Sequence, residues 1–126
     1  MKEIVTSWFL LAVMVVLFFV NSHTLSGVSE DMCSDIEMLG KIIQEENTSK
    51  GEFEIKKLRQ KWNEDCKKLF HIFPHTYLED IERLIIMTEV HIRNNEPNDA
   101  VLRLEEIKHR IKTLEENEKI TLDNIF

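Results

Sequence analysis

Two cysteines, Cys33 and Cys66, are the first residues whose type suggests chemistry. If their segments form an antiparallel helical hairpin that turns near Thr48 and Ser49, the two lie within about 3 Å of each other along the axis. A disulfide could then form and would persist outside the cell, where it would stabilise the fold by about 3–4 kcal/mol. Two buried free thiols are the alternative. The chain has no Cys-x-x-Cys motif, which argues against redox catalysis.

His71 and His75 have the spacing at which two imidazoles on a regular helix can share a metal ion. Pro74 interrupts such a helix, so the spacing argument fails. A third ligand would have to come from Glu79, Asp80 or His91. We therefore predict no metal site and no cofactor, and expect His75 to be a loop or cap histidine beside one of the two acids.

Nucleophilic catalysis has few residues to use. No serine follows Ser49, and the chain has no Gly-x-Ser-x-Gly, phosphate-binding or dinucleotide-binding motif. Adjacent carboxylates such as Glu105 and Glu106 do not face each other and are typical of a solvated helix surface. The sequence therefore predicts a protein without catalytic residues.

The N-terminal segment from Ile4 to Val20 holds 17 residues without a charge. As a helix it is about 25 Å long, at the short end for a bilayer core of about 30 Å. The amino group and Lys2 precede it, and neither Lys nor Arg occurs between Asn21 and Gly40. The positive-inside rule then predicts a cytoplasmic N-terminus and an extracytoplasmic remainder at the cell membrane.

Whether this segment is cleaved decides between a tethered and a secreted protein. Cleavage prefers small residues in an Ala-x-Ala-like pattern, and the candidate sites at 20–22, 24–26 and 25–27 match that pattern poorly. We therefore expect a retained anchor that contacts membrane lipid. The alternative is a secreted helical ligand released by signal-peptide cleavage.

The net charge of −7 lies wholly after Val20, because Lys2 and Glu3 cancel. An acidic domain is a poor partner for nucleic acid, which we exclude. Acidic residues dominate 29–46 and basic residues dominate 50–68. These two segments should attract each other as neighbouring, solvated helix faces.

Four amphipathic segments follow the anchor, at about 29–46, 50–73, 77–93 and 98–116, each with apolar residues three or four positions apart. Their short connections favour antiparallel neighbours. We predict an all-α fold, in which an N-terminal transmembrane helix precedes a small antiparallel bundle of two helical hairpins. The expected regions are an anchor at 1–22, a bundle at 29–118 and an apolar tail at 119–126.

The expected boundaries rest on local signals. Capping boxes are predicted at Ser49–Glu52 and Thr76–Glu79, where a hydroxyl would accept from an amide three residues on. Pro74 should end the second segment near Phe73, and Pro97 should lie near the start of the fourth. The terminal Ile125 and Phe126 should either fold back on the bundle or form a short docking peptide.

The chain resembles domain-of-unknown-function family 4363, small single-pass proteins of endospore-forming Gram-positive bacteria. The resemblance rests on the N-terminal anchor, Trp62 in a Lys-rich segment, and His75 followed by Glu79, Ile81 and Glu82. Segments 100–104 and 122–126 extend it, whereas the two cysteines and Glu79 depart from it. The resemblance implies an uncharacterised membrane-associated protein and no catalytic residues.

The function we expect is therefore a non-enzymatic interaction or accessory module. Its partner would be another integral membrane protein or a second copy of the chain. Residues that could take part are Trp62, His75, Tyr77, Glu79 and Phe126.

Overall fold

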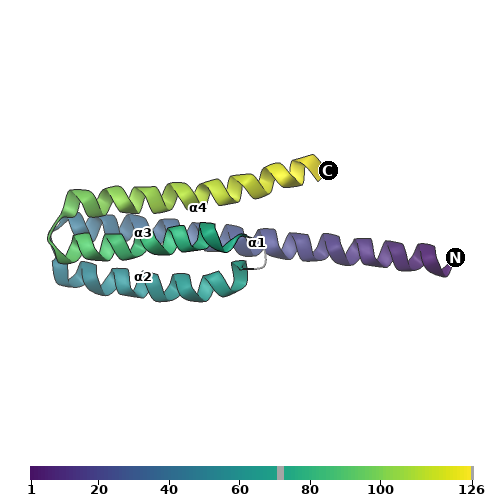
Figure 1. Ribbon diagram of the computed structural model, residues 1–126, viewed down its shortest axis with the longest axis horizontal. Coiled ribbons are helices and arrows are strands. Elements are labelled where there is room, and N and C mark those ends of the chain that lie inside the picture. Colours follow the sequence, from purple (N-terminus) through teal and green to yellow (C-terminus); the bar gives the residue numbers. More distant parts are fainter. Residues whose placement is uncertain (71–72, 126) are drawn as a thin grey trace.

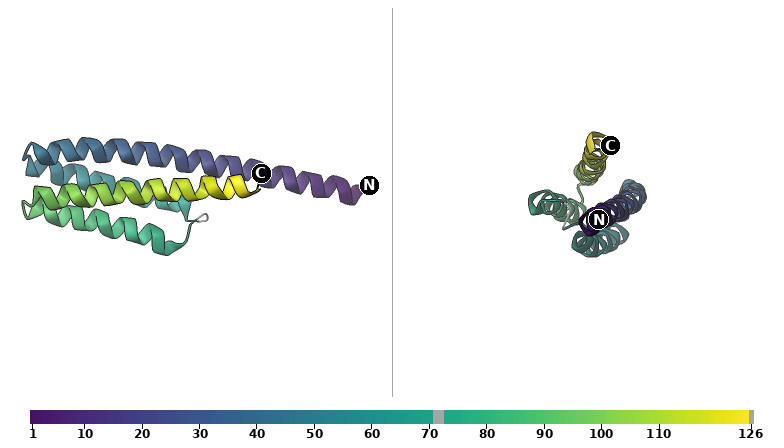
Figure 2. Two further views of the ribbon diagram at one scale, coloured as in Figure 1. Left: turned by 90° about the horizontal axis from the view of Figure 1, so that it is seen from above. Right: turned by 90° about the vertical axis from the view of Figure 1, so that its right-hand side faces the viewer.

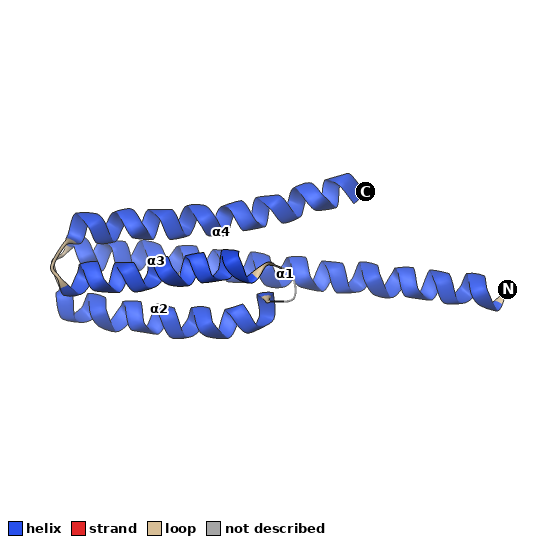
Figure 3. Cartoon of the chain, in the orientation of Figure 1, coloured by secondary structure: helices blue, strands red, loops and turns tan. Residues whose placement is uncertain are grey.

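A computed structural model describes residues 1–70 and 73–125, although the side chains of residues 21, 118–123 and 125 lie outside that description. Within the described residues the chain forms four helices: α1 (Lys2–Gln44), α2 (Thr48–Leu69), α3 (His75–Arg93) and α4 (Pro97–Ile125) (Figure 3). This confirms the predicted all-α fold.

The four helices form an antiparallel bundle with α1 extending far beyond one end (Figure 1). α1 packs against α2 and α4, and α3 packs against the same two helices, so each helix contacts its neighbours around a ring. The short connections make consecutive helices antiparallel, as expected for two helical hairpins (Figure 2).

The core consists of one apolar stripe from each helix, with residues spaced three or four positions apart. α1 contributes a stripe from Leu25 to Ile43, and Trp62 is the largest fully buried side chain. Other nearly inaccessible core residues are Met32, Ile36, Ile55, Leu69, Ile81, Ile85, Ala100, Leu104, Ile107 and Ile111. The predicted stripes are therefore the faces that meet.

α1 is a single helix of 43 residues, without a break between its apolar N-terminal part and its core-forming part. Every side chain from Met1 to Val20 is exposed or only half-buried. In the described residues α1 is the one helix long and apolar enough to cross a membrane. An N-terminal signal sequence would pass the same test of length and composition.

The helix starts differ from the predicted capping boxes. The side chain of Asn47, not Ser49, caps α2 by accepting from the Lys50 amide at 3.2 Å. Gly51 is buried against Ile92, whose Cγ2 would lie 3.3 Å from an added Cβ. α3 begins at His75 after Pro74, without a side-chain cap. A capping box was therefore the wrong interpretation of both motifs.

The helix ends also differ from expectation. α2 ends at Leu69, four residues before Phe73. α4 begins at Pro97 as predicted, but it continues to Ile125 where the sequence suggested an end near Glu116. No Gly or Pro follows Pro97, so no residue in that stretch interrupts the helix. Phe126 lies outside the described residues.

Candidate functional site

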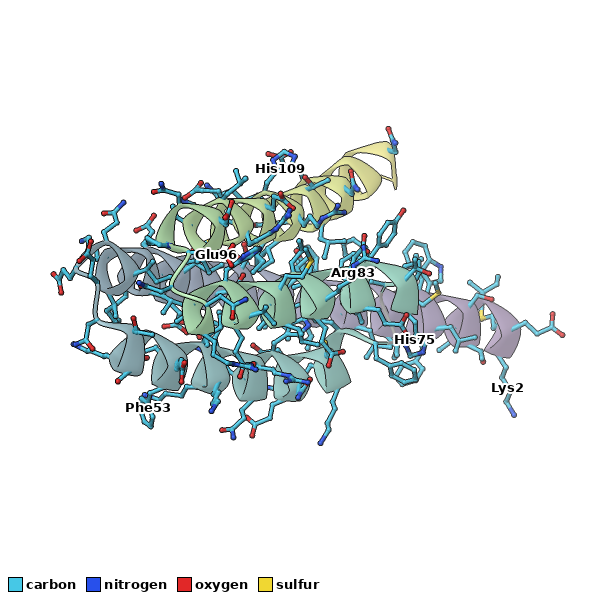
Figure 4. All side chains as sticks on the ribbon, turned by 60° about the vertical axis from the view of Figure 1, so that its left-hand side comes forward. Lys2, Phe53, His75, Arg83, Glu96 and His109 are labelled. Carbon is cyan, nitrogen blue, oxygen red and sulfur yellow. The ribbon has the colours of Figure 1, made fainter. Side chains whose placement is uncertain are left out.

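The start of α3 gathers three of the residues singled out from the sequence. His75, Tyr77 and Glu79 are all exposed in its first turns. The ring centroid of His75 lies 5.1 Å from that of Phe70, which is 44% exposed at the end of α2. In Figure 4, His75 lies at the end of the bundle from which α1 continues toward Lys2.

A hollow and a groove flank this start of α3. Between α2 and α3, a hollow of about 540 Å³ is lined by Cys66, Lys67, Phe70, His75, Leu78, Glu79 and Glu82. Between α3 and α4, a groove of about 650 Å³ is lined by Tyr77, Ile81, Leu102, Glu105, Glu106, His109, Arg110, Thr113, Leu114 and Asn117. We call the second one the α3–α4 groove. Exposed Tyr77 and Leu102 give it an apolar surface, and the charged side chains of Glu105, Glu106 and Arg110 also line it.

Trp62 lies elsewhere. Its side chain is only 1% exposed and belongs to the core, so it offers no surface to a partner in this structure. Its indole Nε1 is buried without a hydrogen-bond partner among the described residues. Any role of His75, Tyr77, Glu79, Trp62 or Phe126 in binding stays a prediction.

The two cysteines are free thiols with different neighbours. Burial raises the pKa of the Cys33 thiol, against the opposing charges of Lys112 and Lys108 on α4. Burial raises the pKa of the Cys66 thiol to about 11, and the charge of Glu82 on α3 adds to the increase. Neither thiol is therefore an activated nucleophile at neutral pH. The disulfide between them stays a prediction.

Among the described residues, the structure does not bring together as one cluster the histidines and acids that were considered as metal ligands from the sequence. Asp80 forms ion pairs with Arg83 on its own helix and with Arg110 of α4, the latter at 3.1 Å. His91 lies 16 residues from His75, about 24 Å along α3, so it cannot complete a metal site with His75. His71 lies outside the described residues.

A different cluster forms at the α3–α4 turn. The ligand atoms of His91, Glu96 and Asp99 lie within 4.8 Å of one another, which is close enough to hold a divalent cation. His91 Nδ1 already lies 3.2 Å from Glu96 Oε2, a contact that ties the end of α3 to the start of α4. The periodic pattern of the sequence did not reveal the cluster, because its residues meet across the turn between α3 and α4.

Charge pairing between α1 and α2 follows the predicted attraction. Lys61 Nζ on α2 lies 2.9 Å from Asp35 Oδ2 and 3.9 Å from Asp31 Oδ2 on α1. Close by, Asp65 is 8% exposed, and one of its oxygens is buried without a hydrogen-bond partner among the described side chains. Burial raises the pKa of this carboxyl, a feature that the amphipathic pattern did not reveal.

Comparison with known proteins identifies the family. A family model described as domain of unknown function (DUF4363) matches residues 18–125. The chain belongs to this family. Neither a curated protein nor a solved structure matches it. The match begins inside the apolar half of α1 and covers the whole bundle, so the family resemblance noted from the sequence is confirmed.

Proposed function

We propose that this DUF4363 protein is a membrane-anchored module whose helical bundle binds another integral membrane protein on the extracytoplasmic side. One observation supports this most. Residues 4–20 of α1 expose apolar side chains on every face, including Trp8 and Phe9 at 68% each. A helix that is apolar all round requires lipid or protein around it. The proposed module binds its partner and performs no chemistry itself.

The α3–α4 groove is the surface on which we place the partner. It is larger than the hollow between α2 and α3, and it exposes an aromatic side chain, Tyr77. Exposed aromatic residues with a polar rim are typical of binding sites on proteins. Exposed Glu105 also lines the groove and can favour a partner of opposite charge.

The burial of Leu25 bears on the alternative, a secreted ligand. Leu25 is 1% exposed and Val28 is 8% exposed, so both are core residues. Cleavage after Ser26 or Gly27 would remove Leu25 from the core. A signal peptidase would have to cut near Ser22 to release an intact bundle. The burial of Leu25 therefore disfavours the candidate cleavage sites at 24–26 and 25–27 and leaves the one at 20–22.

The test begins with membranes washed in alkaline carbonate, followed by intact mass spectrometry with and without alkylation. The proposal predicts that the protein resists the wash and keeps residues 2–27. A soluble product that starts near His23 would refute the anchor and support the secreted ligand. The mass difference on alkylation also shows whether Cys33 and Cys66 are oxidised.

Partner binding needs a second test. A photo-crosslinking amino acid at Tyr77 should give a discrete product with one membrane protein in intact cells. The same amino acid at Phe53, which is 64% exposed on α2, is the matched control. Equal labelling at both positions would refute a specific role for the groove.

A further inference from the structure

Ion pairs fix how far each helix reaches along α1. Lys61 lies opposite Asp31 and Asp35, so Phe70, nine residues further along α2, is about level with residue 24. Ser29 donates to Glu115 at 2.8 Å and Lys108 pairs with Glu37 at 3.2 Å, so the end of α4 is about level with residue 20. One end of the bundle therefore begins where the charge-free stretch of α1 ends.

No linker separates the charge-free stretch of α1 from the bundle. Because α1 is continuous, the four residues from Val20 to the level of Phe70 span about 6 Å. The headgroup layer on each side of a bilayer is about 5–7 Å thick. A span of 17 residues is also shorter than the hydrocarbon core by about 5 Å, which draws its flanking residues toward the membrane.

The side chains at this end suit such a layer. We define the proximal face as Lys67, Phe70, His75 and Tyr77, of which Tyr77 also lies at the proximal end of the α3–α4 groove. Phe70 is 44% exposed and Tyr77 is 53% exposed, and Lys67 is exposed beside them. Helical side chains tilt toward the N-terminus of their helix, so Tyr77 in the first turn of α3 tilts toward the membrane side. Aromatic residues accompanied by Lys are typical of membrane–water interfaces.

We propose that the proximal face rests on the lipid headgroups of the membrane that holds α1. The proposal depends on the membrane anchoring proposed above but not on a partner protein. The bundle would then be held by two contacts, α1 within the bilayer and the proximal face upon it. Its orientation relative to the membrane would be fixed rather than free.

The test places tryptophan at two exposed phenylalanine positions of α2. In a Trp8→Phe background, Phe70→Trp reports on the proximal face. The matched control is Phe53→Trp, which lies about 25 Å from Phe70 toward the N-terminus of α2. Trp62 is buried in both proteins and gives a constant background. The full chain is reconstituted in phosphatidylcholine vesicles with and without bromine on the lipid chains near the headgroup.

Bromine quenches only nearby tryptophan. The proposal predicts that brominated lipid reduces the emission of the tryptophan introduced by Phe70→Trp about twofold, as expected for a side chain in a thin interfacial layer. The tryptophan introduced by Phe53→Trp should keep its full emission. If neither variant loses emission in brominated vesicles, the proposal is overturned. Protection of the Phe70→Trp variant from aqueous acrylamide without quenching by bromine would also overturn it, because a second copy would then cover the face.

The wild-type protein separates this result from failure of the anchor. Trp8 should be quenched by lipids brominated deep in their chains. If Trp8 is quenched and the tryptophan introduced by Phe70→Trp is not, the membrane anchor is supported and the contact between the proximal face and the headgroups is refuted. If Trp8 is not quenched, the anchoring itself is wrong.

Discussion

Residues 4–20 and 25–43 of α1 have the same backbone conformation but opposite relations to water. The first segment exposes apolar side chains on all faces, whereas the second buries one stripe and exposes charges such as Asp31, Glu37 and Lys41. The difference lies in the spacing of apolar residues, not in helix formation. A single helix can therefore have lipid as the solvent of one half and water as the solvent of the other.

The most demanding test of this contrast removes one tryptophan from the anchor and one from the bundle. Trp62→Ala should destabilise the bundle by about 3–5 kcal/mol, because it empties a fully buried site. Trp8→Ala should leave the stability unchanged, because Trp8 touches no core residue. Urea unfolding in detergent, followed by circular dichroism, measures both. Equal losses would show that the two regions fold as one unit.

A charge in the anchor should have the next largest effect. Ala12→Arg, at the centre of the apolar span, should cost about 3 kcal/mol of membrane insertion. The carbonate-resistant fraction should fall accordingly. Met38→Arg, at a bundle position 53% exposed, should leave that fraction unchanged. An anchor that tolerates Arg at residue 12 would contradict a lipid environment.

Asp65 shows how the bundle tolerates a charge that the bilayer would not. Burial raises the pKa of its carboxyl, so the folded protein holds the proton to higher pH than the unfolded chain. The group's contribution to stability is therefore complete below its ordinary pKa of 3.8 and is lost as the pH rises through the folded value.

Asp65→Asn should accordingly stabilise the bundle at pH 7, by about 1 kcal/mol. The gain should vanish toward pH 3, where the carboxyl is protonated in both states. Denaturant midpoints across this pH range measure it, and Glu64→Gln, at an exposed neighbour, is the control. A gain that does not change with pH would contradict a role for the buried charge.

The smallest effect concerns the ion pairs that only the second half of α1 makes. Lys61→Met should cost about 0.5 kcal/mol, because the pair with Asp35 is more than a third exposed. The loss, measured by urea unfolding, should disappear near 1 M salt, where screening is strong. Lys56→Met, at an exposed position on the same helix, should change nothing.

The sequence was sufficient to predict the bundle because each stripe records which face of a helix is buried. The continuity of α1 could not be predicted from Asn21 to Val28, whose Ser, Thr and Gly residues favour helix only weakly. The helix continues there because Leu25 and Val28 pack into the core, which is a tertiary effect. The sequence pattern also did not reveal the cap of α2, where Asn47 and not Ser49 accepts from the Lys50 amide.

The candidate site was less predictable. His75, Tyr77 and Glu79 were each named from the sequence as residues that could take part in binding, and they are exposed together at the start of α3. The α3–α4 groove and the cluster of His91, Glu96 and Asp99 depend on how α4 meets α3. Periodicity within one helix contains no information about the angle at which α4 packs on α3 or about which polar side chains meet across a turn.

The uninterrupted α1 also sets the rotational orientation of the bundle about the helix axis. Each helical residue turns the chain by about 100° and raises it by about 1.5 Å. One residue inserted between Val20 and Leu25 would therefore swing the α3–α4 groove by more than a quarter of a circle about the helix axis. In the proposed anchored state, the number of residues between bilayer and core would specify the direction in which the bundle faces its neighbours in the membrane plane.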